Sequence, residues 1–310
     1  MKILLLFSGG LDSILCYKIL EQKNYTVKAV QFYTPFLHIQ DIEKYKEFYK
    51  KKYNILIHVI DIWNDYKKIL INPQFGFGKN LNPCLDCKLL FYKKAEEIFV
   101  KNGFDLIATG EVIGQRPFSQ KTDTINLLEK YSNLKGKILR PLSYFHSAKI
   151  EGEVFYNFKG RGRKNQIELA KEFNIEPIPT PAGGCLLTEP TYCEKLIKLY
   201  SFLENSIEKF EEIYFELIKF GRVFNIDNCF LIIGRNKIDS ENFQKLFKKS
   251  NNFYLIITSN YPGPVSALIL KNNSKITKNI FEKIKEFVKK DYRENIEFKI
   301  LKESDELLSC

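Results

Sequence analysis

A pair of glycines interrupts the first apolar run of the chain. Residues 3–7 are continuously apolar, residues 8–13 are SGGLDS, and an apolar pattern with helical spacing resumes over residues 12–22. A short run that is apolar at every position is typical of a strand buried on both faces, as in a parallel sheet. Parallel strands need a crossover connection, which is usually a helix. The N-terminus therefore predicts a strand, a glycine turn and a helix, the first unit of an α/β fold.

The same alternation continues through the first half of the chain. We expect strands over 27–33, 55–60 and 104–109 and helices over 42–53 and 87–102. Strands that alternate with helices indicate a parallel sheet with helical crossovers. Ligands of such sheets bind beyond the carboxyl ends of the strands. The segments after Phe7, Tyr33 and Thr109 are therefore expected to meet in one crevice.

The pattern changes in the last third of the chain. With 310 residues, of which 45% are hydrophobic, the chain is long enough for two domains. We expect an α/β domain over 1–198 and a smaller α+β domain over 199–310. The second domain should contain a long amphipathic helix from about 200 to 219 and a further helix over 276–290, with strands near 229–233, 253–258 and 296–301.

The glycine turn has the chemistry of a phosphate site. Glycines let the backbone approach an oxyanion closely, the helix that follows presents its positive end, and Ser8 and Ser13 add hydroxyl donors. The turn has neither GxxxxGK[ST] nor GxGxxG, which disfavours ordinary ATP hydrolysis and hydride transfer. The alternative is a plain turn before a helix capped by Asp12 or Ser13.

SGGLDS resembles the PP-loop, SGGxDS, of the N-type ATP pyrophosphatases. Members of that superfamily cleave ATP between its α and β phosphates and use AMP to activate a carbonyl oxygen. The resemblance implies ATP and Mg²⁺ as cofactors and places Gly110, after the 104–109 strand, beside the nucleotide. Arg116 is then expected to contact phosphate or RNA, with a surface ion pair as the alternative. The residues implied in nucleotide binding are Ser8, Gly9, Gly10, Asp12, Ser13, Gly110 and Arg116.

Three cysteines suggest metal or sulfur chemistry. Cys84 and Cys87 form a CxxC, and Cys185 lies in the glycine turn AGGC. A helix N-terminus would lower the pKa of the CxxC thiols. A structural zinc ion usually has four ligands, and His38, His58 and His146 have no recognisable metal spacing. A [4Fe-4S] cluster with one open iron fits three cysteines, and a persulfide pair of Cys87 and Cys185 is the alternative. The remaining thiols, expected to be ordinary, are Cys16, Cys193, Cys229 and Cys310.

The segments around the CxxC and Gly110 resemble motifs of the bacterial tRNA 2-thiouridylases. NPCLDCK (82–88) is similar to NPCxxCN and ATGEV (108–112) to ATGHY, with Lys88 in place of Asn and Glu111 in place of His. Further segments resemble a thiouridylase-like PP-loop subgroup: ATGEVIGQRPFSQ, ILRPLS, GRGRKNQIELAKEF and PAGGCLLTEP. The resemblance implies a tRNA sulfurtransferase that adenylates a uridine carbonyl and replaces its oxygen with sulfur, 2-thiouridine being favoured over 4-thiouridine. Asp12, Cys87 and Cys185 would be catalytic, and the metal ligands would be Cys84, Cys87 and Cys185.

The charge balance is compatible with a nucleic-acid partner. The formal net charge is +11, from 48 Lys and Arg against 37 Asp and Glu, and such an excess attracts polyanions. The loop GRGRK, with Arg161, Arg163 and Lys164, is expected to contact tRNA or pyrophosphate. LIIGRNKIDSENFQKL (231–246) resembles a segment of the NFACT-type RNA-binding module, which implies that the second domain binds RNA.

The remaining expectations concern location and partners. No apolar run reaches the roughly 20 residues that span a bilayer, so we expect a cytoplasmic protein without a membrane partner. The partners implied are tRNA and a sulfur donor, either sulfide or a persulfide carrier, and the choice between monomer and homodimer stays open. Two other functions remain as alternatives: a PP-loop enzyme that amidates or desulfurates a small molecule, and an RNA-binding protein regulated by nucleotide.

Overall fold

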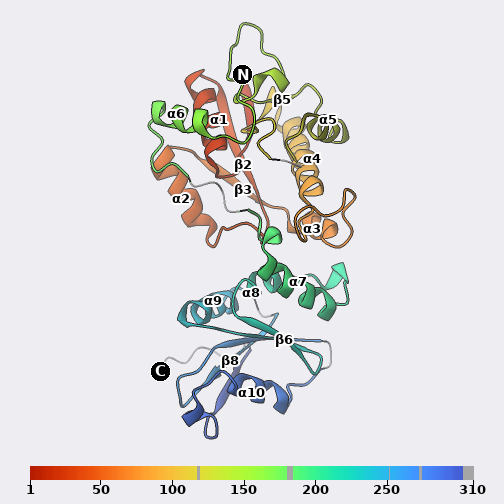
Figure 1. Ribbon diagram of the computed structural model, residues 1–310, viewed down its shortest axis with the longest axis vertical. Coiled ribbons are helices and arrows are strands. Elements are labelled where there is room, and N and C mark those ends of the chain that lie inside the picture. Colours follow the sequence, from red (N-terminus) through yellow and green to blue (C-terminus); the bar gives the residue numbers. More distant parts are fainter. Residues whose placement is uncertain (117–118, 180–183, 251, 272–273, 303–310) are drawn as a thin grey trace. The chain divides into compact units, whose positions relative to one another are not determined.

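The computed structural model describes residues 1–116, 119–179, 184–250, 252–271 and 274–302 (Figure 1). The chain divides into two compact units, Met1–Thr188 and Glu189–Cys310. The boundary expected after residue 198 falls within α7 (Pro190–Phe202), in the second unit. Within the described ranges, no helix has the length and apolarity needed to cross a bilayer.

The first unit is built on a five-stranded parallel sheet, as the sequence predicts. The strand order is β3-β2-β1-β4-β5, and each neighbouring pair is parallel. Ile3, Leu4 and Leu5 of the central strand are fully buried, because helices cover both faces. The strands are β1 (Lys2–Leu6), β2 (Thr26–Tyr33), β3 (Ile57–Asp61), β4 (Leu106–Thr109) and β5 (Ile138–Leu139).

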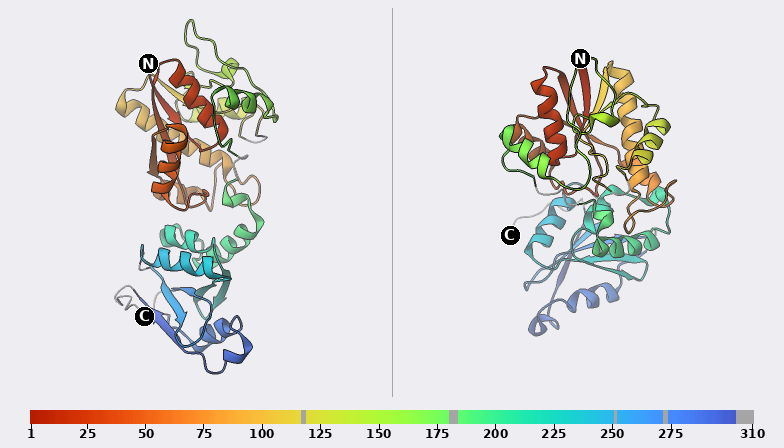
Figure 2. Two further views of the ribbon diagram at one scale, coloured as in Figure 1. Left: turned by 90° about the vertical axis from the view of Figure 1, so that its left-hand side faces the viewer. Right: turned by 45° about the horizontal axis from the view of Figure 1, so that its top comes forward.

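Helices form a layer on each side of this sheet. Helices α1, α2 and α6 cover one face, and α3, α4 and α5 cover the other (Figures 1 and 2). The helices are α1 (Leu11–Gln22), α2 (Ile42–Tyr53), α3 (Trp63–Tyr66), α4 (Cys84–Asn102), α5 (Thr122–Tyr131) and α6 (Lys164–Glu172). Short 3-10 turns are η1 (Lys67–Ile69), η2 (Tyr144–His146) and η3 (Leu186–Thr188).

The strand order locates the ligand crevice of the first unit. Strand β1 lies between β2 and β4, so the chain leaves β1 toward one edge of the sheet and later returns to its other side. Open α/β sheets bind ligands outside the carboxyl ends of the strands at such a switch point. The turn after β1 and the segment after β4 therefore share the crevice.

The second unit contains an antiparallel sheet of order β10-β8-β9-β7-β6. Helix α9 lies on one face and α10 on the other (Figures 1 and 2). Side chains of β7 alternate, so that Leu231 packs toward Ile284 of α10 while Phe230 stacks on Phe202 of α7. Its elements after α7 are η4 (Ile207–Lys209), α8 (Glu212–Leu217), β6 (Arg222–Ile226), β7 (Cys229–Ile233), α9 (Lys237–Phe247), β8 (Tyr254–Thr258), β9 (Ser266–Leu270), α10 (Lys278–Lys285), η5 (Lys290–Tyr292) and β10 (Phe298–Leu301).

The prediction of a long helix from about 200 to 219 is wrong. The chain leaves α7 at Leu203, and Glu204 and Asn205 adopt positive φ angles of 59° and 54°, which end a right-handed helix. Tyr200 and Phe210 then stack at 5.3 Å across the turn. Tyr200 and Phe210 therefore contact each other because the chain turns back between them, and not because both lie on one long helix. Helix α8 is a separate short helix. Strands β6 and β9 were not predicted.

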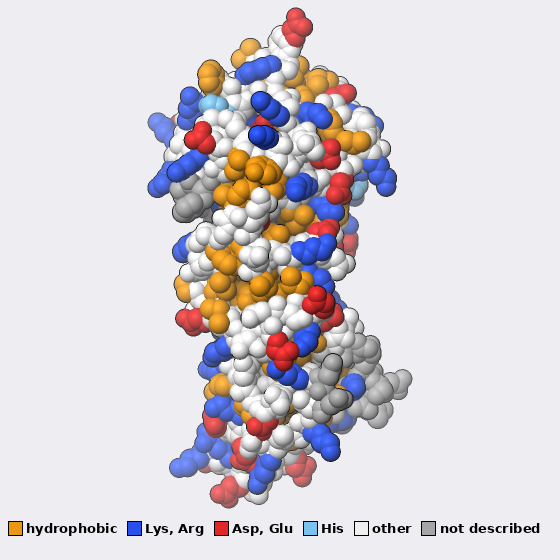
Figure 3. Space-filling view, turned by 90° about the vertical axis from the view of Figure 1, so that its right-hand side faces the viewer, with side chains coloured by type: hydrophobic (Ala, Val, Ile, Leu, Met, Phe, Trp, Pro, Cys, Tyr) orange, Lys and Arg blue, Asp and Glu red, His pale blue; other side chains and the backbone are white. Residues whose placement is uncertain are grey.

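Charged side chains are spread over the molecule. On the face shown in Figure 3, Lys and Arg side chains are interspersed with Asp and Glu on both units. The net charge of +11 is therefore not gathered into a single basic patch on that face.

Candidate nucleotide and sulfur site

The backbone of the phosphate turn, residues 8–13, is open to an anion. Gly10 is the N-cap of α1, and no side chain caps this helix. Ser13 Oγ donates to the Gly10 carbonyl at 2.8 Å and does not accept from the helix. The alternative of a turn capped by Asp12 or Ser13 is therefore wrong. The Ser13 amide donates to the Gly10 carbonyl at 3.1 Å, and the N–H groups before it in α1, those of Leu11 and Asp12, suit a phosphate oxygen.

Two tyrosines of α2 hold the turn from the side. Gly9 has φ +76°, and the Tyr49 hydroxyl donates to its carbonyl at 2.7 Å. A Cβ at Gly9 would lie 2.4 Å from the Tyr45 hydroxyl oxygen. That hydroxyl also donates to the buried Gln31 amide oxygen of β2. Sequence reasoning missed both tyrosines, although their four-residue spacing on α2 places them on one helix face.

Gly110 brings the end of β4 against the phosphate turn. A Cβ at this position would lie 2.5 Å from the carbonyl carbon and oxygen of Asp12 and 2.7 Å from the Ser13 nitrogen. Contacts this short to backbone atoms exclude every residue except glycine without a shift of the chain. The structure thus brings together the two segments on which the nucleotide-binding residues were predicted.

Asp12 gathers the polar side chains of the crevice. Burial raises the pKa of its carboxyl group, and a hydrogen bond from Gln115 and the charges of Arg163 and Arg116 act in the opposite direction. Its Oδ1 is buried and has no hydrogen-bond partner among the residues described. A carboxylate oxygen left unpartnered beside a phosphate turn is a donor that Mg²⁺ prefers, so the site fits this ion.

The basic glycine loop lies beside the segment that carries Arg116. Gly160 donates to the Ile113 carbonyl at 2.8 Å, and Lys159 forms an isolated bridge with Ile113. Arg163 directly precedes α6 and donates to the Pro179 carbonyl at 3.2 Å. Within this loop, Arg161 and Lys164 are exposed.

The three predicted cysteines come from two segments of the first unit. Cys84 is the first residue of α4, Cys87 follows one turn later, and Cys185 directly precedes η3. The Cys185 segment is anchored on both sides: Leu186 donates to the Phe36 carbonyl at 3.0 Å, and His38 Nε2 lies 2.9 Å from the Gly184 carbonyl oxygen. The segment that follows β2 therefore holds in place the segment that contains the third thiol, Cys185.

The Cys87 thiol interacts with the other two. Burial raises its pKa well above the ordinary value, the neighbouring thiols of Cys185 and Cys84 act in the same direction, and a hydrogen bond with Tyr66 opposes them. The lowered pKa expected for a thiol at a helix start is therefore wrong for Cys87. All three sulfurs are close enough to interact electrostatically, although no group of three or more His, Cys, Asp or Glu in the described ranges has a metal-site arrangement.

The thiols fit an iron-sulfur cluster by their chemistry. The residues Cys84, Cys87 and Cys185 are each half-buried. Thiolates are the usual ligands of such clusters. Asp86, between the CxxC cysteines, accepts hydrogen bonds from the Gln74 and Phe75 amides at 2.8 and 3.0 Å. It holds the loop before α4, a role that sequence reasoning did not identify.

The two departures from the thiouridylase motifs contact each other. Lys88 Nζ forms an ion pair with Glu111 Oε1, and it also donates to the Ser119 carbonyl. Lys88 follows Cys87 directly, and Glu111 follows Gly110. This pair therefore connects the start of the cysteine helix to the end of β4, where the nucleotide-binding residues gather.

The Lys88–Glu111 pair is part of a buried network. Glu111 Oε2 accepts from Arg140 Nε at 2.9 Å and from the Tyr92 hydroxyl at 2.8 Å. Arg140, whose exposed fraction is 1%, also pairs with Glu129 at 2.7 Å. Charges buried in this way are tolerated only when every one is paired.

The network predicts a pH dependence of stability. Burial alone would raise the pKa of Glu111, but the charges of Lys88 and Arg140 outweigh it and lower the pKa from 4.5 to about 2. A lowered carboxyl pKa contributes stability that is present above the unfolded pKa and is lost as pH falls toward the folded one. This contribution is about 3 kcal/mol at neutral pH.

Glu111→Gln should therefore lose stability at neutral pH and flatten the pH dependence between about pH 4.5 and 2. Urea unfolding across this range measures both effects. Glu43→Gln, which alters an exposed pair with Lys46, is the matched control and should behave as the unaltered chain does. Parallel pH curves for Glu111→Gln and the unaltered chain would contradict the assignment.

The other cysteines are ordinary where the structure describes them. Cys16, Cys193 and Cys229 are buried, as predicted, and burial raises the pKa of Cys16 and Cys229. Cys310 lies outside the described residues.

The GRN segment of the second unit has a structural role. Arg235 makes three hydrogen bonds to Asp239, two from its guanidinium group at 2.8 and 3.2 Å and one from its amide at 3.0 Å. Asn236 caps α9 by accepting from the Asp239 amide. Asp239 also accepts from the Gly221 amide at 3.1 Å, which ties the start of β6 to α9.

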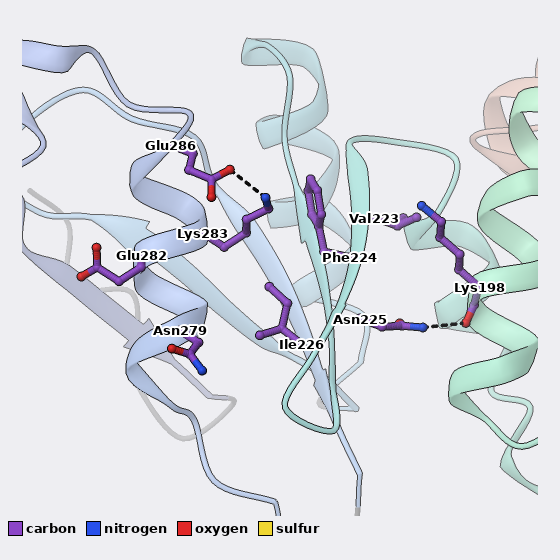
Figure 4. A pocket seen from close by; sticks show the side chains of 9 residues that line it. All are labelled: Lys198, Val223, Phe224, Asn225, Ile226, Asn279, Glu282, Lys283 and Glu286. Atoms are coloured by element: carbon purple, nitrogen blue, oxygen red, sulfur yellow. Dashed lines mark hydrogen bonds and ion pairs between the residues drawn. The ribbon is translucent and has the colours of Figure 1, made fainter.

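A cavity of about 470 Å³ lies in the same unit, between β6 and α10 (Figure 4). Among the residues that line it, Lys283 pairs with Glu286 at 2.7 Å, and the Asn225 side-chain amide donates to the Lys198 carbonyl at 3.4 Å. The cavity contains no predicted site residue, so the candidate site remains the crevice of the first unit.

Parts of the chain are similar to known proteins. The family model "Thiamine biosynthesis protein (ThiI)" matches residues 1–152. The tRNA-specific 2-thiouridylase MnmA of Campylobacter curvus is 28% identical over 215 residues, covering 65% of this chain and 59% of that protein. MnmA of Campylobacter hominis is 31% identical over 117 residues, covering 36% of this chain and 32% of its own length.

Among solved structures, a 4-thiouridine synthetase–RNA complex with bound ATP is 20% identical, with a TM-score of 0.43, and the match covers 67% of this chain and 52% of that one. The match with the Campylobacter curvus relative spans about three fifths of that protein's length. Residues 1–152 thus match the model of the ThiI family, and tRNA-specific 2-thiouridylases are similar to parts of the chain.

Proposed function

We propose that this chain is an ATP-dependent tRNA sulfurtransferase. One observation carries the proposal: the Lys88–Glu111 ion pair joins a helix that begins with two thiols to a strand end packed on the phosphate turn. Nucleotide activation and sulfur delivery would then share one crevice. The relatives support tRNA as the substrate, and 2-thiouridine is the product we favour.

The nucleotide half of the site activates the base. The carbonyl oxygen of the target uridine attacks the α phosphorus of ATP, a new P–O bond forms, and the bond to pyrophosphate breaks. The uncapped start of α1 and the hydroxyls of Ser8 and Ser13 bind the leaving pyrophosphate. Asp12 would hold Mg²⁺, which offsets phosphate charge. Arg116 and Arg163 lie close enough to act on the same charges.

The thiol half supplies the sulfur. A sulfur nucleophile attacks the activated carbon, the C–S bond forms, and AMP leaves with the former carbonyl oxygen. Cys84, Cys87 and Cys185 would hold a [4Fe-4S] cluster, which supplies an iron without a protein ligand to bind sulfide. In the persulfide route, Cys87 carries the transferred sulfur as a persulfide, whose outer sulfur bonds to the base. The Cys185 thiol then attacks the Cys87 sulfur, the thiolated base leaves, and the Cys87–Cys185 disulfide that forms is reduced by an external thiol. The cluster route takes sulfide from its donor, and the persulfide route takes the outer sulfur of a persulfide donor.

The second unit is proposed to bind tRNA. Its basic residues would contact phosphates, which set the position of an RNA without selecting its sequence. Because ATP and tRNA are cytoplasmic molecules, the proposed reaction takes place in the cytoplasm.

The charge of Asp12 tests the nucleotide half. Asp12→Asn keeps the shape of the side chain and removes the charge beside the phosphate turn, so release of AMP and pyrophosphate should fall by about 100- to 1000-fold. Radiolabelled AMP from α-labelled ATP in the presence of tRNA measures it. Asp123→Asn, on the exposed surface of α5, is the control and should retain full activity. Unchanged AMP release by Asp12→Asn would refute the assignment.

A further inference from the structure

An exposed aromatic ring beside the crevice has an unusual set of neighbours. Phe145, on η2, is 69% exposed. Lys159 Nζ lies 5.4 Å from its ring centroid, Lys149 Nζ lies 6.0 Å away, and the His146 ring meets it edge-on at 5.1 Å. We call Phe145, His146, Lys149 and Lys159 the Phe145 surface. A large exposed ring flanked by cations combines stacking area with positive charge.

The surface is held rigidly. The Phe145 amide donates to Asn157 Oδ1 at 2.6 Å, and the Tyr144 amide donates to the Tyr156 carbonyl at 2.9 Å. Lys149 Nζ lies 4.2 Å from the Tyr144 ring centroid and donates to the Tyr144 carbonyl. The ring is therefore presented to solvent by a fixed backbone, which reduces the entropy lost when a ligand binds.

The surface adjoins the segments that line the nucleotide site. Lys159 bridges to Ile113, and the Ile113 amide donates to Ser143 Oγ at 3.1 Å. Gln115 and Arg116, which act on Asp12, follow Ile113 within a few residues.

The charge of the surrounding segment matches a polyanion. Residues 143–164 carry five Lys and Arg, with two acidic residues, Glu151 and Glu153. Glu153 is engaged by Lys23 and by the Tyr25 hydroxyl. Exposed lysines beside an exposed aromatic ring are the combination to which single-stranded nucleic acids bind: bases stack on the ring and the lysines contact phosphates.

We infer that the Phe145 surface binds an unpaired nucleotide of the RNA. Its base stacks on Phe145, and Lys149 and Lys159 contact the flanking phosphates. This inference rests on the proposed function for the identity of the RNA, but it assigns a binding site that neither the motifs nor the relatives specify.

Binding of a labelled single-stranded oligouridine of about ten nucleotides to the full chain tests the inference by fluorescence anisotropy. Phe145→Leu keeps an apolar side chain and removes the stacking face, so affinity should fall about 5- to 100-fold. Lys149→Gln and Lys159→Gln should each weaken binding. Each should also lower the slope of the logarithm of the binding constant against the logarithm of the salt concentration by about 1, as the loss of one phosphate contact does. Val154→Ala, at an equally exposed apolar residue of the same segment, is the matched control and should bind as the unaltered chain does.

Unchanged oligouridine affinity in Phe145→Leu would overturn the inference, and so would an equal loss of affinity for a double-stranded RNA, which offers no unstacked base. Thiolation of saturating tRNA distinguishes the two proposals. If the unaltered chain thiolates tRNA while Phe145→Leu binds RNA normally, this inference fails and the proposed function stands. If oligouridine binding depends on Phe145 but no tRNA is thiolated, the proposed function fails and the site stands.

Discussion

Replacing Cys87 with serine is expected to stop sulfur transfer while ATP is still converted to AMP. Burial raises the pKa of Cys87, and Cys185 and Cys84 act in the same direction, so both of these thiols lie close to it. The groups assigned to adenylation belong to α1 and to the segment after β4. Loss of a sulfur-bearing residue should reduce thiolation by at least about 1000-fold, as removal of a covalent nucleophile does.

Nucleoside mass spectrometry of the treated tRNA measures this loss, and chromatography of the nucleotides measures AMP. Cys310→Ser, at a cysteine without an assigned role, is the control and should keep both activities. Thiolation by Cys87→Ser at the rate of the unaltered chain would remove the cysteines from the mechanism. A parallel loss of AMP formation would instead show that Cys87 is needed for the nucleotide site to form.

Cys84→Ser separates the two sulfur routes in the same assay. A cluster needs all three thiolates, so its loss should abolish thiolation together with the iron and acid-labile sulfide of anaerobically purified protein. A persulfide pair of Cys87 and Cys185 does not need Cys84, and thiolation would then persist without iron.

Replacing Arg140 with alanine is expected to be the most destabilising single change in the first unit. The guanidinium group is buried between the carboxylates of Glu111 and Glu129, and removing it would leave two buried negative charges with only Lys88 nearby. Breaking a buried ion pair by removing one partner costs about 3–5 kcal/mol. The same change should disturb the connection between β4 and α4.

Urea unfolding followed by tryptophan fluorescence measures this effect in the correct unit, because the single tryptophan, Trp63, is buried in α3. Lys46→Ala removes an exposed cation paired with Glu43 and should cost less than about 1 kcal/mol. A free energy of unfolding for Arg140→Ala equal to that of Lys46→Ala would show that the network does not stabilise the fold.

The sheet of the first unit could be predicted because its signals are local. The continuous apolar run of β1, the glycines after it and the charged pattern of α2 each lie within a short window, and α2 begins and ends at the expected residues. Helix α4 begins at Cys84 and not at Cys87, since the amide of Cys87 already donates to the Pro83 carbonyl at 2.8 Å. The CxxC therefore forms the first turn of a helix.

The contacts that join the two halves of the site could not be predicted. Lys88 and Glu111 are recognisable in the sequence only as departures from a motif. Their pairing depends on β4 lying next to β1 and on α4 packing over β4, which are properties of the sheet order. The unpartnered Oδ1 of Asp12 and the tyrosines over Gly9 likewise arise from packing between distant segments.

The most direct test of the central claim is nucleoside mass spectrometry of tRNA incubated anaerobically with the protein, ATP, Mg²⁺ and sulfide, with AMP measured in the same samples. The account predicts a thiolated uridine, together with one AMP for each sulfur incorporated and no product when ATP is omitted. AMP formation that needs no tRNA, or tight tRNA binding with neither AMP nor thiolated nucleoside, would contradict it.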